Sequence, residues 1–75
     1  MVRLSTEFYS AAGIRAAIDA LEDFGAFRWN ESAKDGYFDI EVEAAEDVDG
    51  SELEGEFANF ALARSVEAAR ASDAA

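Results

Sequence analysis

The sequence predicts an α+β domain of order β-α-β-β-α, in which a three-stranded sheet carries two helices on one face. Two patterns support this fold class. Apolar and polar residues alternate over Val2–Phe8 and over Tyr37–Ala44, which is the period of a half-buried strand. Apolar residues recur at helical spacing over Ala11–Phe24 and from Glu52 to Arg70. Since each element has an apolar side to cover, the helices and one sheet face are expected to share a core.

The first strand and the first helix follow directly from these periods. Ser10 is expected to cap the helix, because its hydroxyl can accept a hydrogen bond from a backbone N–H of the first turn. Gly25 follows the helix and is expected to end it by adopting the left-handed backbone conformation. If the strands before and after this helix are adjacent and parallel, their crossover is right-handed. The residues expected to face the core are Val2, Leu4, Thr6 and Phe8 of the strand and Ile14, Ala17, Ile18 and Leu21 of the helix.

A β-hairpin is predicted next. Phe27–Glu31 and Tyr37–Ala44 alternate on either side of Ser32–Gly36, which ends in the turn dipeptide Asp-Gly. Arg3 and Arg28 are expected to lie near the acids on the polar sheet face. Phe38, Ile40, Val42 and Ala44 are expected to point inward, and Tyr37, Asp39, Glu41 and Glu43 outward.

The last helix shows the strongest signal. Ser51 and Glu54 have the spacing of a capping box, which starts a helix that runs to about Arg70. Residues 1–71 are predicted to form one small domain, and residues 72–75 a frayed tail. The side expected to cover the sheet consists of Leu53, Phe57, Phe60 and Ala61.

Charge excludes several classes of partner. The 75 residues include 17 acids and six bases, a formal net charge of −11. Nucleic acid and anionic membranes both select clustered Lys and Arg, so neither is an expected partner. Phe27, Trp29, Tyr37 and Phe38 could stack RNA bases, but their acidic surroundings favour core and hairpin packing. No signal peptide or apolar run of about 20 residues is present, so a cytoplasmic location is predicted.

Side chains for catalysis are scarce. The sequence has no Cys and no His, which removes the thiolate nucleophile and the commonest general base and metal ligand. Asp39, Glu41 and Glu43 share one sheet face, where like charges could raise a carboxyl pKa. That face is expected to be wet and balanced by Arg3 and Arg28. We therefore predict that the protein is not an enzyme and uses no cofactor.

The acidic loop before the last helix suggests an ion site as an alternative. Asp47, Asp49 and Glu56 match acidic positions of a calcium-binding EF-hand loop. Ala45 stands where that loop requires its first carboxylate, and the capping box begins the helix too early for the full loop. A solvated acidic turn is the main expectation, and calcium binding remains the alternative.

A second apolar stripe on the last helix is formed by Ala58, Leu62, Val66 and Ala69. A helix that packs on one sheet needs only one stripe. The second stripe either packs partly against the first helix or forms a surface for a partner or a second copy of the chain.

Two segments carry a resemblance. Phe8–Ala17 has a strand that ends in Tyr-Ser and enters a helix, and Glu56–Arg64 has a Glu-Phe-x-Asn-aromatic-x-Leu motif. Together they resemble the HxsD-like family, small accessory proteins of the His-Xaa-Ser system that occur with radical-SAM enzymes modifying ribosomally made peptides. The resemblance implies a peptide-binding or scaffolding subunit without catalytic residues. The residues that carry it are Tyr9, Ser10, Glu56, Phe57, Asn59, Phe60, Leu62 and Arg64.

The resulting hypothesis is a non-catalytic binding or adaptor domain that acts beside a peptide-modifying enzyme. Its expected partner is a protein, a peptide or a second copy in a homodimer. The alternatives are a calcium-binding domain built on the acidic loop and a small structural protein.

Overall fold

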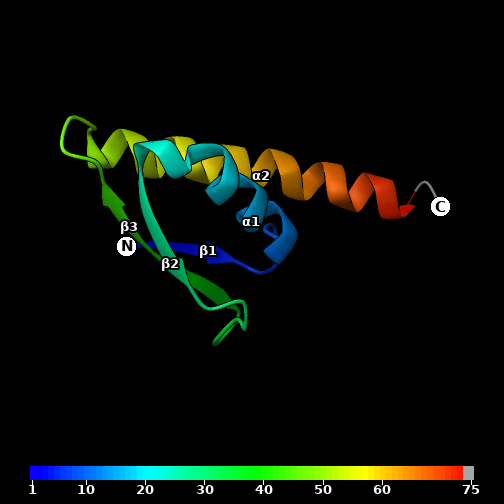
Figure 1. The fold of residues 1–75 in the computed structure, drawn as a ribbon. Helices are drawn as coiled ribbons and strands as arrows, with labels where there is room; N and C mark the ends of the chain where they lie inside the picture. Colours follow the sequence, from blue (N-terminus) through cyan, green and yellow to red (C-terminus); the bar gives the residue numbers. More distant parts are fainter. Residues whose placement is uncertain (74–75) are drawn as a thin grey trace.

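A computed structural model describes the backbone of residues 1–73 and the side chains of residues 1–70. Its elements are β1 (Val2–Ser5), α1 (Ala11–Leu21), the 3-10 turn η1 (Glu22–Phe24), β2 (Gly25–Trp29), β3 (Tyr37–Ala44) and α2 (Gly50–Asp73). Within this range the chain forms a three-stranded antiparallel sheet of order β1-β3-β2. Figure 1 shows both helices on one face of the sheet. The predicted fold class and order of elements are therefore confirmed, and β3 separates the strands on either side of α1.

The first strand is shorter than predicted. The carbonyl oxygen of Ser5 accepts hydrogen bonds from the N–H groups of Phe8 and Tyr9, at 3.2 and 3.0 Å. These bonds turn the chain, so Thr6 and Phe8 do not continue the strand. The side chain of Phe8 is 62% exposed, and its predicted inward orientation was wrong.

The cap of α1 is as predicted, but the end of the helix is not. The Ser10 hydroxyl accepts a hydrogen bond from the Gly13 N–H at 3.0 Å. After α1, the single turn η1 leads straight into β2. Gly25 has a φ of 173°, which is extended backbone, so the left-handed helix end predicted there was wrong. A side chain would not fit at Gly25, because a Cβ there would lie 2.6 Å from the Glu43 carbonyl oxygen.

The hairpin between β2 and β3 is confirmed. Asp35 and Gly36 both have positive φ, 56° and 82°, which is the signature of a type I′ turn. Lys34 and Tyr37 exchange backbone hydrogen bonds across this turn, at 2.9 and 3.1 Å. The turn places the apolar side chains of β3 toward the helices.

The start of α2 differs from the predicted capping box. The helix begins at Gly50, and the Asp49 carboxylate accepts hydrogen bonds from the N–H groups of Ser51 and Glu52, at 2.9 and 3.2 Å. Asp49 is therefore the cap, and Glu54 instead pairs with the N-terminal amine at 3.3 Å. At its other end α2 is described through Asp73. The predicted tail includes residues 74–75, which lie outside the described residues.

This cap has a measurable consequence. Asp49→Ala is expected to destabilise the protein by about 1 kcal/mol, because two N–H groups of the first turn lose their acceptor. Ser51→Ala, the matched control from the predicted capping box, is expected to change stability by less than about 0.5 kcal/mol. Urea denaturation followed by circular dichroism measures both. An equal loss in the two variants would show that Ser51 shares the capping role.

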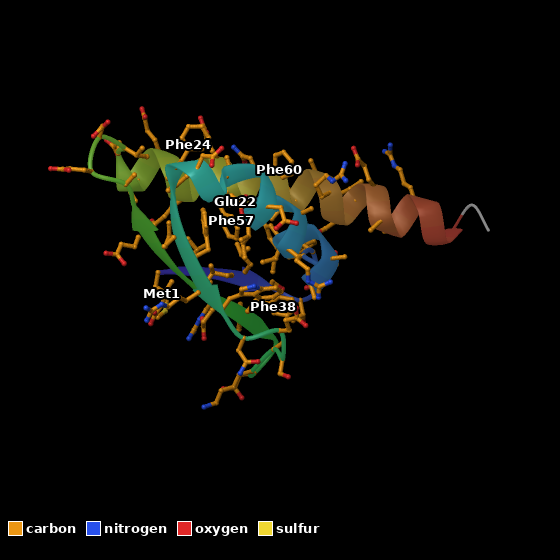
Figure 2. The ribbon with its side chains drawn as sticks, viewed as in Figure 1. Met1, Glu22, Phe24, Phe38, Phe57 and Phe60 are labelled. Carbon is orange, nitrogen blue, oxygen red and sulfur yellow. The ribbon has the colours of Figure 1, made fainter. Side chains whose placement is uncertain are left out.

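The core lies between the helices and the inner sheet face. Phe57 is fully buried and stacks on Phe27, with ring centroids 5.0 Å apart. Figure 2 shows Phe57 below α2, between the helices and the sheet, whereas Phe60 lies on the outer side. Phe60 is 38% exposed, so its predicted place against the sheet was wrong. The buried apolar side chains are Leu4, Ile14, Ala17, Leu21, Phe38, Ile40, Leu53, Phe57 and Ala61.

Candidate functional site

The second stripe of α2 divides into a buried end and an exposed part. Ala58 is half-buried and packs against the core. Leu62 and Val66 are 38% and 42% exposed, and Ala69 is also exposed. We call Ala58, Leu62, Val66 and Ala69 the α2 stripe. Since α1 does not bury Leu62 and Val66, the structure leaves an apolar surface along the second half of the helix.

The far end of the α2 stripe continues onto the loop that follows β1. Ala69 and Phe8 line the same shallow hollow, together with Ser10 and Ser65. The exposed ring of Phe8 therefore adds apolar surface beside Ala69. The alternation of the first strand predicted that Phe8 points inward, so the sequence did not indicate that its ring belongs to an exposed apolar surface.

The two helices meet at a polar junction. Ser65 is 6% exposed, and its hydroxyl oxygen accepts a hydrogen bond from the Ser10 N–H at 2.9 Å. The same hydroxyl donates to the carbonyl oxygen of Ala61 at 2.7 Å. Gly13 lies against this junction, where a Cβ would come within 2.7 Å of that carbonyl oxygen. Ser65 was not predicted as a site residue, although it continues the four-residue spacing of the buried Leu53, Phe57 and Ala61.

The same junction brings together the two segments that carry the family resemblance. Ser10 belongs to the first, and Ser65 directly follows the second. The residues that carry the resemblance differ in exposure. Phe57 is buried, and Tyr9 and Ser10 are half-buried. The exposed ones are Glu56, Asn59, Phe60, Leu62 and Arg64. Arg64 pairs with Glu67 at 3.0 Å. The resembling residues thus form a core contact, a helix cap and an exposed surface rather than one cluster.

The acidic loop holds no assembled ion site. Among the described residues, no group of three or more Asp, Glu, His or Cys side chains is placed to hold a metal ion. Asp49 already accepts two backbone hydrogen bonds at the start of α2. The candidate ligands Asp47, Asp49 and Glu56 are therefore not brought together.

The outer sheet face is polar and open. Arg3 pairs with Asp39 at 2.9 Å and lies over the ring of Tyr37, 5.3 Å from its centroid. The hydrogen bond from Arg3 to Asp39, together with the charge of that carboxylate, raises the pKa of Arg3. A raised arginine pKa stabilises the fold below the ordinary arginine range and loses that effect only in strong alkali, so it creates no switch near neutrality. Arg28 lies opposite Glu41 in the hairpin register, as the charge pattern predicted.

Most of the aromatic side chains of the hairpin face the core. Trp29 packs edge-on against Phe38 with ring centroids 5.8 Å apart, and Phe27 stacks on Phe57. Tyr37 lies on the outer face and is 42% exposed. The packing predicted for the rings of Phe27, Trp29 and Phe38 is confirmed, and the four rings do not form a continuous platform on the open face.

Comparisons with protein-family models, curated proteins and solved structures find no match to this chain. In the described part of the chain, no helix has the length and apolarity needed to cross a membrane. The function of this protein must therefore be inferred from its surfaces.

Proposed function

We propose that this protein is a non-catalytic binding or adaptor domain that uses the α2 stripe to hold a protein or peptide partner or a second copy of itself. The observation that carries the proposal is the exposure of Leu62 and Val66, at 38% and 42%, on a helix whose core side is already filled. Exposed apolar side chains that adjoin one another along an element mark interaction sites more often than chance. The cytoplasmic location predicted from the sequence belongs to the same proposal.

The shape of α2 supports this role. Figure 1 shows its last turns extending beyond α1 and the sheet. Val66 and Ala69 are both exposed in this half of the helix. An α-helix of 24 residues is about 36 Å long, which makes α2 the longest element of the molecule. A partner helix that lies along this surface would bury the α2 stripe and Phe8 together. The α2 stripe and Phe8 would then belong to a single interface with that partner.

The finer form of the proposal is an accessory role beside a radical-SAM enzyme that modifies a ribosomally made peptide. It is supported by the resemblance of Tyr9-Ser10 and Glu56–Arg64 to the HxsD-like family. A genomic survey tests it: a radical-SAM gene beside this one in several genomes is expected, and its consistent absence would leave the binding role without this context.

Leu62→Glu tests the α2 stripe. The variant is expected to weaken self-association or partner binding by about a hundredfold, because it places an unpaired carboxylate in an apolar contact. The fold should persist, since Leu62 is not part of the buried core. Light scattering on a sizing column measures the mass against the 8.1 kDa of one chain. Circular dichroism checks the fold of each variant.

Ala63→Glu is the matched control. It adds the same charge to an exposed position one residue along α2, which points about 100° away from Leu62. The control is expected to leave the mass unchanged. If the wild type is monomeric and Leu62→Glu unfolds it, the α2 stripe belongs to the core and the interface proposal is wrong. If the wild type is monomeric and the variant folds, self-association is excluded and the proposal is restricted to a protein or peptide partner.

A further inference from the structure

A shallow groove runs along the outer surface between α1 and α2, away from the sheet. Ala12 and Ala16 of α1 form one side, and Arg64, Glu67 and Ala68 of α2 form the other. Phe60 lies one turn before Arg64 on α2 and therefore continues the second side. We call these six residues the outer groove. The alanines keep it shallow, and small side chains of this kind allow another helix to approach closely.

Two exposed aromatic rings lie on the helical layer, one in the outer groove and the other at the acidic turn η1. Phe60 is 38% exposed and Phe24, which closes η1, is 47% exposed. In Figure 2 both rings lie on the outer side of the helices, away from Phe57 and the sheet. The backbone of Phe24 is held in place, because its carbonyl oxygen accepts a hydrogen bond from the Ala45 N–H at 2.9 Å. Exposed rings on fixed backbone are typical anchors for a partner.

The charge around these rings indicates the chemistry of the partner. Glu22 and Asp23 precede Phe24 in η1, and Glu56 lies one turn before Phe60 on α2. None of these three carboxylates forms an ion pair within the described side chains. Arg64 is the basic residue of the outer groove, and its guanidinium already pairs with Glu67. The rings are therefore bordered by uncompensated negative charge.

This charge selects between two kinds of occupant. A second copy of the chain that used the same surface would bring its own Glu22, Asp23 and Glu56 beside these carboxylates, which opposes association there. An amphipathic helix with lysine or arginine beside its apolar side would place apolar residues on the rings and cations near the three carboxylates. A basic amphipathic helix therefore matches both the exposed rings and the three carboxylates.

We propose that the outer groove binds a basic amphipathic helix, with Phe60 and Phe24 as apolar anchors and Glu22, Asp23 and Glu56 as its cation partners. The inference depends on the proposed binding role but concerns a different side of α2. Phe60 and Leu62 are two residues apart, so they point about 160° away from each other around the helix axis. One protein could thus hold a copy or partner on the α2 stripe and a basic helix on the outer groove.

Phe60→Ser tests the anchor without changing the charge. The probe is a fluorescein-labelled synthetic helix with leucines on one side and lysines on the other, titrated by fluorescence anisotropy into the full chain. Phe60→Ser is expected to weaken its binding about tenfold, as loss of an aromatic anchor does. Tyr37→Ser, the matched control, removes a ring of similar exposure from the outer sheet face and is expected to leave the affinity unchanged. The same peptide with glutamates in place of lysines is expected not to bind.

Equal affinities for Phe60→Ser and Tyr37→Ser would overturn the proposal, because the peptide would then be held by charge alone. Binding of the glutamate peptide, or no binding of the lysine peptide at millimolar concentration, would overturn it too. Amide shifts in an NMR titration of the wild type locate the peptide independently of any variant. Shifts at Ala16 and Phe60 are expected, and shifts confined to Leu62 and Val66 would assign the peptide to the α2 stripe. The mass change caused by Leu62→Glu is a separate readout, so the two proposals can fail independently.

Discussion

Phe57→Ala is expected to destabilise the protein by about 3–5 kcal/mol, the largest effect of any single truncation in this fold. Phe57 is fully buried, and its ring stacks on Phe27 between α2 and the sheet. Domains gain about 0.05–0.15 kcal/mol of stability per residue, so a chain of 75 residues has about 4–11 kcal/mol in total. The variant is therefore expected to be partly or largely unfolded at 25 °C. Urea denaturation followed by circular dichroism measures the loss.

Phe8→Ala is the control for this prediction, since it removes the same ring from a side chain that is 62% exposed. Its expected effect is less than about 0.5 kcal/mol, the usual range for surface changes. A loss below about 1 kcal/mol for Phe57→Ala would contradict the placement of Phe57 in the centre of the core.

Gly13→Ala is expected to destabilise the protein by about 2 kcal/mol, although alanine is normally the better helix residue. A Cβ at Gly13 would overlap the Ser65 hydroxyl and would lie 2.7 Å from the Ala61 carbonyl oxygen. That carbonyl oxygen belongs to the backbone, so α2 would have to move away from α1. The movement would also weaken the hydrogen bond from Ser10 to Ser65. Thermal and urea unfolding of the purified variant measure the effect.

Gly55→Ala provides the contrast. Gly55 lies inside α2, and a Cβ there would meet no atom within 4 Å. The same substitution is expected to stabilise the protein by about 0.5–1 kcal/mol, because it removes the backbone entropy cost of glycine. Opposite signs for the two variants would establish that contact between the helices determines the cost at Gly13. Stabilisation by both variants would mean that the helices are packed less closely than the structure shows.

The local patterns of the sequence were sufficient for the fold class. Alternation located β3, because a half-buried antiparallel strand must present apolar residues on one side, and Phe38 and Ile40 are indeed buried. Helical spacing located α1 for the same reason, with Ile14 and Leu21 on its buried side. Asp35-Gly36 predicted the hairpin, since few residues other than Asn, Asp and Gly adopt positive φ in a two-residue turn.

The element ends and the exposure of individual side chains required the tertiary structure. Alternation continues through Phe8, but the Ser5 carbonyl turns the chain before that residue. The capping pattern at Ser51 was outcompeted by Asp49, because the Asp49 carboxylate reaches two N–H groups of the first turn. Such competition between neighbouring polar groups depends on distances that a residue pattern does not contain.

Of the two candidate surfaces, the sequence predicted one and could not predict the other. Periodicity identified the α2 stripe as a second apolar side of the last helix, and only the structure shows that Leu62 and Val66 are exposed. The outer groove could not be predicted, because it exists only where α1 and α2 lie side by side. Phe60 shows the physical reason: its angle around the helix axis was readable from spacing, but the position of α1 decided that this angle faces solvent. The sequence by itself determined which sides of each element are apolar, and the packing of elements distant along the chain decided which of those sides stay exposed.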